Sequence, residues 1–233
     1  HSADSCILSP FFKYLCRMSK NTLHTSEIIA QVSKGLALPV MEHFYTIQGE
    51  GFHSGVPCYF IRLGGCDVGC PWCDVKESWQ INKEDNLSID SIITEVLNSG
   101  ASFCVITGGE PCMHDLTELT SRLTKENIEI AIETSGCYPL KGFIDWYCFS
   151  PKKFKKPVES SYDIANELKV IIAHSSDFEW AEGHAKKVNE NCQLFLQPEW
   201  GKQERFLPMI VDYVKNNPQW RISLQTHKYL NIP

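Results

Sequence analysis

Three cysteines lie within eight residues of one another, at Cys66, Cys70 and Cys73. Thiolates bind zinc and iron–sulfur clusters, and closely spaced thiolates on a glycine-containing loop can surround one centre. A structural zinc site needs a fourth ligand, and Cys58 or His53 could supply it only if the chain folded back. A [4Fe–4S] cluster on three cysteines instead leaves one iron open to a further ligand. The spacing favours such a cluster, with a zinc-binding module without catalysis as the alternative.

Short apolar segments rich in β-branched and aromatic residues alternate with amphipathic segments from residue 57 onward. The predicted strands are residues 59–63, 103–107, 129–133, 146–149, 168–172, 193–197 and 221–225. The predicted helices are residues 89–97, 115–127, 177–190 and 203–217, with Ser88, Asp115 and Asp177 as N-caps. Strands that alternate with helices indicate an α/β fold, a parallel sheet with its helices packed outside.

Polar motifs follow six of the seven predicted strands. The first residues of these motifs are Gly64, Thr107, Glu133, Ser150, Gln197 and Gln225. Ligands of parallel α/β folds collect at the carboxyl ends of the strands. The six motifs therefore predict one shared site, next to the three cysteines.

The chain has 233 residues and a formal net charge of −6. We expect one catalytic domain at residues 38–233, after an N-terminal arm of unknown role at residues 1–37. The acidic balance gives no electrostatic reason to expect nucleic acid or an anionic membrane as a partner. The sequence contains no apolar run near the ~18 residues of a membrane-spanning helix. Eleven cysteines, an odd count, and the lack of a convincing signal peptide favour the cytoplasm.

The cysteine spacing resembles that of the radical S-adenosylmethionine (SAM) superfamily. Trp72 precedes the last cysteine, and Gly108-Gly109-Glu110-Pro111 follows later in the chain, as in that superfamily. The resemblance implies an incomplete, TIM-like (β/α) barrel with a mostly parallel sheet. It also implies that SAM binds the open iron and that one electron from the cluster cleaves it. The resulting 5′-deoxyadenosyl radical abstracts a hydrogen atom from the substrate.

Two flanking segments, residues 44–51 and 220–233, resemble the 7-carboxy-7-deazaguanine synthase family. The resemblance extends from about Leu38 to Pro233. It implies a carbon–nitrogen lyase of queuosine biosynthesis, a tRNA modification pathway. Such an enzyme contracts the ring of 6-carboxy-5,6,7,8-tetrahydropterin and expels ammonia. The alternative within the superfamily is an enzyme that installs a glycyl radical on a partner protein.

The family resemblance assigns two sets of binding residues. The pterin pocket would contain Ile47, Gln48, Gly49, Glu50, Arg62, Thr107, His227 and the terminal carboxylate of Pro233. The SAM site would contain Trp72, Asp74, Gly109, Ser135, Ser150, Lys152 and Gln197. No residue is assigned as an acid–base catalyst. Plainer interpretations are a surface cation for Arg62, a core histidine for His227 and a solvated loop for Lys152.

The sequence departs from the family pattern at Val75, where many members carry Thr or Ser. That hydroxyl group is the protein ligand of a Mg²⁺ ion, and valine cannot bind a hard cation. We expect either that substrate, water and Asp74 hold Mg²⁺ or that the ion is dispensable. The family also implies a flavodoxin- or ferredoxin-type electron donor and a homodimer. Closure of the site is expected from the N-terminal arm, the C-terminal segment or a second subunit.

Overall fold

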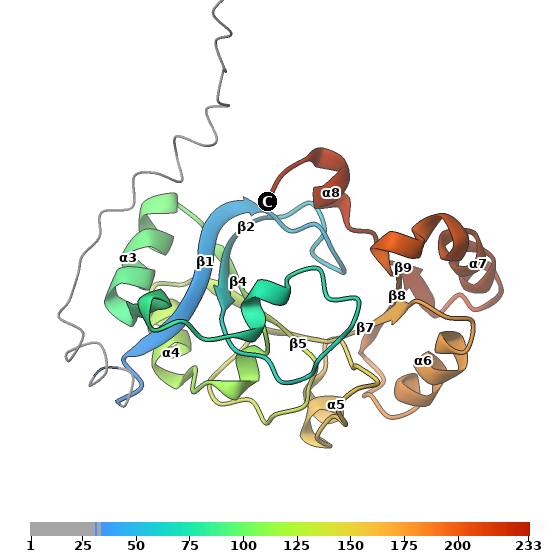
Figure 1. Cartoon of the computed structure of the whole chain (residues 1–233), viewed down its shortest axis with the longest axis horizontal. Coiled ribbons are helices and arrows are strands. Elements are labelled where there is room, and N and C mark those ends of the chain that lie inside the picture. Colours follow the sequence, from blue (N-terminus) through green and yellow to red (C-terminus); the bar gives the residue numbers. More distant parts are fainter. Residues whose placement is uncertain (1–30, 32–33) are drawn as a thin grey trace, which may run out of the picture.

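Residue 31 and residues 34–233 are described by the computed structural model, and most of the predicted N-terminal arm lies outside them (Figure 1). Within these residues a nine-stranded sheet has the order β3-β1-β2-β4-β5-β6-β7-β8-β9. The strands are β1 (Ala37–Ile47), β2 (Pro57–Leu63), β3 (Asn86–Ser88), β4 (Phe103–Gly108), β5 (Glu129–Thr134), β6 (Trp146–Phe149), β7 (Glu167–Ile172), β8 (Gln193–Pro198) and β9 (Trp220–Ile222). β1 is antiparallel to β2 and β3, whereas the neighbours from β2 to β9 run parallel.

Helices α3 to α7 cover the outer side of this curved sheet (Figure 1). They are α3 (Ile89–Ser99), α4 (Thr117–Lys125), α5 (Ser160–Ile164), α6 (Asp177–Ala185) and α7 (Gln203–Asn216). The short helix α8 (Thr226–Leu230) lies instead near the β1–β2 loop, at the open side of the sheet. The predicted incomplete barrel is confirmed, because the sheet ends at β3 and β9 without closing on itself.

Helix α3 illustrates how the local sequence fixes an element. The Ser88 hydroxyl oxygen accepts a hydrogen bond from Ser91 N at 3.1 Å, as an N-cap does. Gly100 ends the helix in the left-handed conformation, with φ at 73°. One face of the helix packs into the core through Ile89, Ile92, Ile93 and Val96. The predicted N-cap at Ser88 is confirmed.

Several predicted element boundaries were wrong. The last predicted strand ends at Ile222, so Ser223 and the following residues leave the sheet and turn toward the interior. Helix α6 ends at Ala185, earlier than predicted. Asp177 does not cap this helix, because its Oδ2 accepts from Ala173 N and His174 N in the preceding loop. Asp115 does accept from Thr117 N at 3.0 Å, at the start of α4.

The interior of the partial barrel changes character along the strands. A small apolar cluster fills it near the strand amino ends, with Cys58, Phe60, Phe103, Val105 and Ala131. Side chains two residues apart on a strand share a face, so Arg62, Thr107 and Glu133 follow this cluster toward the carboxyl ends. The interior is therefore closed by hydrocarbon at one end and polar at the other.

The loop between β1 and β2 folds into this interior. Phe52 stacks on Trp146 with ring centroids 4.6 Å apart, and His53 contacts Phe103 at 4.8 Å. Trp146 and Phe103 begin their strands, so the loop adds to the apolar floor. The residues before Phe52 consequently lie above that floor, within reach of the strand carboxyl ends.

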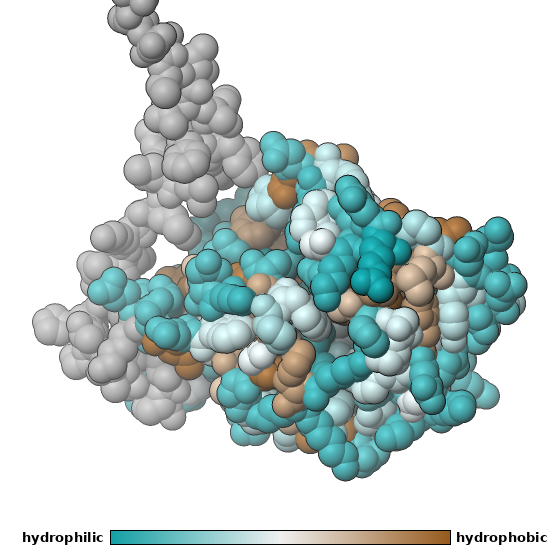
Figure 2. All heavy atoms as spheres, turned by 45° about the vertical axis from the view of Figure 1, so that its right-hand side comes forward, coloured by the Kyte–Doolittle hydropathy of each residue, from teal (hydrophilic) through white to brown (hydrophobic). Residues whose placement is uncertain are grey.

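Hydrophilic side chains cover most of the face in Figure 2, and hydrophobic ones form separate small groups. Within the described residues, the structure contains no helix that is long and apolar enough to span a membrane. The large buried cluster lies between the sheet and the outer helices, and its largest side chains include Trp220, Tyr147, Phe149 and Phe206.

Candidate active site

The cysteine loop begins directly after β2. Cys66 N donates to Trp79 O at 3.1 Å, which fixes the start of the loop. The side chains around the loop gather in one apolar cluster: Cys66, Val68, Cys70, Trp72, Cys73, Cys137 and Tyr138. The three predicted thiols are therefore brought together at the carboxyl end of the sheet.

This donor set fits an iron–sulfur cluster. Each thiolate of a cubane binds a different iron, so its three sulfurs stand farther apart than the ligands of a single ion. Burial raises the pKa of Cys70 to about 11, so cluster binding has to displace the thiol proton.

Asp67 anchors the cysteine loop to two other loops. Its Oδ2 accepts hydrogen bonds from Tyr138 Oη at 2.5 Å and Lys155 Nζ at 2.6 Å. The Lys155 ammonium also lies 4.1 Å from the centroid of the Tyr138 ring. The loop is thereby attached to the segments that follow β5 and β6.

The Gly-Gly-Glu-Pro motif packs against the cysteine loop through its backbone. Gly109 N donates to Leu63 O at 2.8 Å, and Glu110 N donates to Gly65 O at 2.8 Å. A Cβ atom on Gly109 would lie 2.2 Å from Gly65 O. Glycine is required here because any side chain would push the two loops apart.

Glu110 is buried and joins the ends of β4 and β5. Its carboxylate accepts from Cys112 N at 3.0 Å and from Ser135 N at 2.9 Å. The hydroxyl groups of Thr134 and Ser135 donate to the same carboxylate. The predicted SAM ligand Ser135 therefore already supports Glu110.

The other predicted SAM residues lie around the same mouth. Lys152 Nζ donates to the backbone and hydroxyl oxygens of Ser150, both at 2.6 Å, and lies 5.8 Å from the Trp72 ring centroid. Gln197 Oε1 accepts from Ser223 Oγ at 2.6 Å. Gln197 and Ser150 are buried, so these polar groups are fixed at the strand ends.

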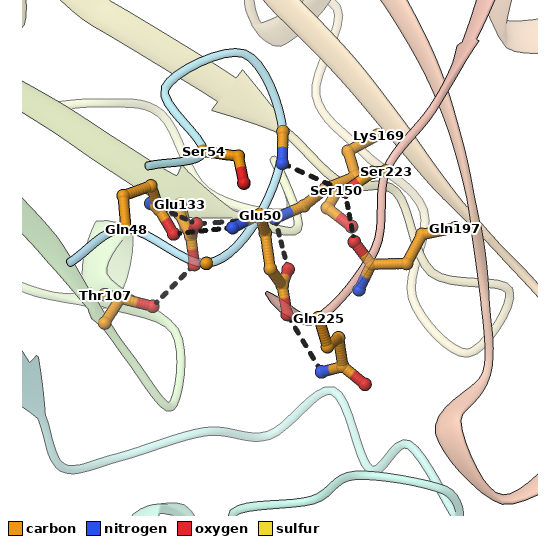
Figure 3. A network of polar contacts seen from close by, with 12 residues as sticks. Gln48, Glu50, Ser54, Thr107, Glu133, Ser150, Lys169, Gln197, Ser223 and Gln225 are labelled. Atoms are coloured by element: carbon orange, nitrogen blue, oxygen red, sulfur yellow. Dashed lines mark hydrogen bonds and ion pairs between the residues drawn. The ribbon is translucent and has the colours of Figure 1, made fainter. Parts of the chain in front are cut away.

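Three of the predicted pterin residues, Gln48, Glu50 and Thr107, form a polar network with Glu133 and Lys169 (Figure 3). Gln48 Nε2 donates to Glu133 Oε1 at 3.1 Å, and Gln48 Oε1 accepts from Glu50 N at 3.0 Å. Thr107 Oγ1 donates to Glu133 Oε2 at 3.3 Å. Lys169 Nζ donates to Glu50 Oε2 at 2.6 Å and to Glu133 Oε1 at 3.3 Å. Two carboxylates and one ammonium group thus lie in contact above the apolar floor.

Gln225 connects this network to the cysteine loop. Its Nε2 donates to Glu50 Oε1 at 2.8 Å and to Asp74 Oδ2 at 3.2 Å. Lys228 Nζ donates to the same Asp74 oxygen at 3.0 Å. Asp74 directly follows Cys73, so the two predicted binding regions are physically joined.

The C-terminal segment crosses the open side of the partial barrel (Figure 1). Thr226 N donates to Gly49 O at 2.9 Å, and a Cβ atom on Gly49 would lie 2.3 Å from His227 Nδ1. Thr46 Oγ1 donates to Pro233 O at 3.3 Å, next to Ile47. The expected contribution of this segment to closure agrees with its position.

Arg62 faces the same side of the sheet as Thr107, with which it is in register. Its Nε donates to Glu42 Oε1 at 2.6 Å, and its side chain is 19% exposed. Within the described chain, the two Nη groups make no hydrogen bond and are free for an anion.

Lys169 was not predicted, and neither Glu133 nor Gln225 was assigned to a ligand. Lys169 stands inside the apolar strand 168–172, and a charged residue in a buried strand was the available signal. Glu133 and Gln225 were recognised only as the first residues of strand-end motifs.

A protein ligand for Mg²⁺ at position 75 does not fit this chain. Val75 offers no oxygen ligand from its side chain. The carboxylate of Asp74 already binds Lys228 and Gln225, and these contacts hold its pKa below the usual range against the opposing effect of burial.

The chain is similar in sequence to radical SAM proteins and to 7-carboxy-7-deazaguanine synthases. Residues 60–147 match the Radical SAM superfamily. The chain is 59% identical over 209 residues to a 7-carboxy-7-deazaguanine synthase of Flavobacterium psychrophilum, which covers 90% of this chain and 99% of the relative. A protein of the same name from Synechocystis is 46% identical over 197 residues, 84% of this chain and 94% of that relative.

A solved structure agrees with the sequence relatives. The crystal structure of QueE from Escherichia coli aligns with a TM-score of 0.74 and 31% identity. The alignment covers 86% of this chain and 99% of that chain.

Proposed function

The chain belongs to the 7-carboxy-7-deazaguanine synthase family of the radical SAM superfamily, and on that basis we propose the reaction that it catalyses. It is a carbon–nitrogen lyase that converts 6-carboxy-5,6,7,8-tetrahydropterin to 7-carboxy-7-deazaguanine with loss of ammonia. The product is an intermediate of queuosine biosynthesis.

One structural observation supports this reaction at the candidate site. The polar network of Gln48, Glu50 and Glu133 lies beside the three-cysteine loop, and Gln225 joins Glu50 to Asp74. A substrate on the network is therefore placed next to the cluster and SAM. Radical transfer requires this proximity because the reacting atoms must be held within contact distance.

Cys66, Cys70 and Cys73 would hold the [4Fe–4S] cluster, whose open iron takes SAM. When bound, the cluster would supply the electron that cleaves SAM. The 5′-deoxyadenosyl radical from SAM would then remove a hydrogen atom from C6 of the pterin. The remaining ligands of SAM in this proposal are Trp72, Asp74, Gly109, Ser135, Ser150, Lys152 and Gln197.

The chain binds the pterin through hydrogen-bond acceptors and one cationic side chain. The carboxylates of Glu50 and Glu133 suit N–H donors on the edge of the heterocycle, and Thr107 and Gln48 fix the Glu133 carboxylate. The free Nη groups of Arg62 suit the substrate carboxylate, which they can bind in a bidentate manner. Ile47, Gly49, His227 and Pro233 complete the pocket in this proposal.

The apolar floor and the C-terminal segment protect the reaction. Phe52 and Trp146 close the interior below Glu50, and α8 covers the open side through Thr226 and Gly49. Exclusion of water strengthens the electrostatic contacts and prevents loss of reactive intermediates.

Three further features complete the proposal. Because the side chain of Val75 cannot bind a hard cation, turnover proceeds without a Mg²⁺ ion ligated at position 75. The electron donor is of the flavodoxin or ferredoxin type. The enzyme acts as a homodimer.

Anaerobic turnover tests the proposed reaction. The reconstituted enzyme is given SAM, a strong reductant and 6-carboxytetrahydropterin, and the products are identified by mass spectrometry. We expect 7-carboxy-7-deazaguanine, and none from Cys70→Ala. Formation of 5′-deoxyadenosine alone would mean that the substrate is wrong. Zinc without iron in the reconstituted protein, with neither product, would contradict the radical assignment.

A further inference from the structure

Lys169 lies at the centre of the polar network but behind its carboxylates (Figure 3). Its side chain is 5% exposed, whereas those of Glu50 and Glu133 are 16% and 23% exposed. A ligand that enters the pocket consequently meets the carboxylates first. The ammonium group supports them from the buried side.

The strand register explains how one lysine reaches two distant segments. On β6, Cys148 lies in register with Glu133 of β5 and with Glu167 of β7. Lys169 is two residues beyond Glu167 and therefore faces the same side. Because Cys148 and Ser150 are small, the lysine can cross β6 to Glu133 and still bind Glu50.

Fold stability gives little reason for a charged group at this position. The cost of taking buried ions out of water commonly cancels their mutual attraction, and apolar replacements are often as stable. Lys169 also lies in the otherwise apolar segment 168–172, where an aliphatic side chain would complete the strand. The ionic arrangement is therefore better explained by what its carboxylates bind.

Resting on the proposed function, we propose that Lys169 is a positioning residue for the substrate. Its ammonium group keeps Glu50 a carboxylate and aims Glu50 and Glu133 at N–H groups of the bound heterocycle. The matching ligand is a planar heterocycle with neighbouring N–H donors, such as the cyclic guanidine edge of a pterin.

The carboxylates retain the capacity that this role requires. Glu50 Oε1 accepts from Gln225 and Oε2 accepts from Lys169, while Glu133 Oε2 accepts from Thr107. A carboxylate has four acceptor positions, and Gln197 is a third donor to Glu50, so each of the two carboxylates keeps one position for a further donor. A protonated carboxyl group would instead present its own O–H to the ligand and lose one of these acceptor positions.

The charges around Lys169 support a positioning role over proton transfer. Burial alone would raise the pKa of Glu50, but Lys169, Gln225 and Gln197 hold it at about 2. Burial opposes the charge of Lys169, yet its surroundings raise its pKa well above the usual range, so it is a poor acid. The titratable groups near this pair are Glu133, Glu167, Cys148, Lys152, Asp74 and His227.

The first test compares Lys169→Met with wild type in anaerobic turnover from about pH 6 to 9. In wild type, Glu50 stays ionised throughout this range. Without the ammonium, the pKa of Glu50 rises, so the carboxyl group is protonated at low pH and ionises as the pH increases. We expect the KM of Lys169→Met to exceed that of wild type by roughly tenfold or more near pH 6.5, and the ratio to fall at higher pH.

Arg122→Met is the matched control, because it breaks an ion pair with Asp90 on the outer helices. Its KM should equal that of wild type at every pH. A wild-type KM for Lys169→Met, or an increase that is the same at every pH, would overturn the proposal.

A second measurement is independent of the substrate. Burial is the largest influence on the pKa of Glu50, so we expect this pKa to rise above its unfolded value in Lys169→Met. The stability that Glu50 contributes is then present at low pH and lost as pH rises. The Tm of Lys169→Met relative to wild type should therefore fall with increasing pH, as measured without SAM or pterin. A Tm difference that is the same at every pH would contradict the proposal. This outcome does not depend on the identity of the substrate.

The double variant Lys169→Met, Glu50→Gln covers the case in which the single variant does not fold. It removes the orphaned carboxylate, so its Tm should recover and become insensitive to pH. Its KM should remain high because an acceptor is lost. Recovery of the wild-type KM in the double variant would show that Lys169 does not act through Glu50.

Discussion

Glu110 is the residue that holds the cysteine side of the site together. Its buried carboxylate accepts from backbone groups of Cys112 and Ser135 and from the hydroxyl groups of Thr134 and Ser135. A neutral amide has only one acceptor oxygen and would direct its NH₂ group at one of these donors. The acidic residue of the Gly-Gly-Glu-Pro motif is therefore required by the hydrogen-bond donors at the carboxyl ends of β4 and β5.

We predict that Glu110→Gln lowers the free energy of unfolding by about 2–3 kcal/mol, the cost of leaving buried donors unsatisfied. Urea denaturation measures the change. Glu118→Gln on the exposed face of α4 is the control and should change stability by less than about 0.5 kcal/mol. Equal stability of the two variants would contradict the structural role of Glu110.

Val75 gives a second prediction at the residue scale. Val75→Thr restores an oxygen ligand beside Asp74, so added Mg²⁺ should stimulate this variant and not the wild type. A titration of the turnover rate with Mg²⁺ measures the effect, and Val75→Ala controls for altered packing. If the wild-type enzyme already required Mg²⁺, or if Val75→Thr gave an unchanged titration, the interpretation of this position would be wrong.

At the scale of elements, α8 depends on close approach to the β1–β2 loop. A Cβ atom on Gly49 would lie 2.3 Å from His227 Nδ1 and 2.8 Å from His227 N. Backbone at this distance cannot move aside without shifting the C-terminal segment. The glycine in the Gln-Gly-Glu motif is therefore needed for closure of the pocket.

Gly49→Ala should raise the KM for the pterin by about tenfold to hundredfold, since overpacking costs about 1–3 kcal/mol. Steady-state kinetics measures this change. Gly183→Ala is the control: in α6, nothing among the described residues lies within 4 Å of its added Cβ. That substitution should stabilise the protein by about 0.4–1 kcal/mol and leave the KM unaltered. An unchanged KM for Gly49→Ala would show that α8 does not close the pocket.

The predicted strands and helices correspond well to the parallel part of the sheet, because its buried strands are continuous apolar segments. Strand β1 was not predicted. Its second half is only partly buried, and its pairing with β2 shifts register between Val40 and Glu42, so neither clean alternation nor an apolar run marks it. The short β3 and α8 are defined by tertiary contacts and carry no distinct period of their own.

The site was predicted where its residues belong to recognisable motifs, and it was missed at Lys169, which lies inside an otherwise apolar strand. The cysteines and Gln48 stand in recognisable motifs. Lys169 acquires its role only when β5, β6 and β7 align it with Glu133 and Glu50. Pairing across three strands cannot be inferred from the spacing of residues along one chain.

The fold brings segments that are far apart in the sequence together at the carboxyl ends of the strands. Gln225 contacts Glu50 and Asp74, so the last part of the chain connects the first strand pair to the cysteine loop. Hydrocarbon closes the opposite end of the interior, while hydrophilic side chains cover most of the visible outer face (Figure 2). The central claim is that the pterin and SAM share this one enclosed mouth.

The most direct test of this claim is whether a hydrogen atom passes directly from the pterin to the 5′-deoxyadenosyl group of SAM. The measurement is anaerobic turnover of 6-carboxytetrahydropterin that carries deuterium at C6, with mass analysis of the 5′-deoxyadenosine formed. The account predicts one deuterium in 5′-deoxyadenosine, together with formation of 7-carboxy-7-deazaguanine. Product accompanied by deuterium-free 5′-deoxyadenosine would contradict it.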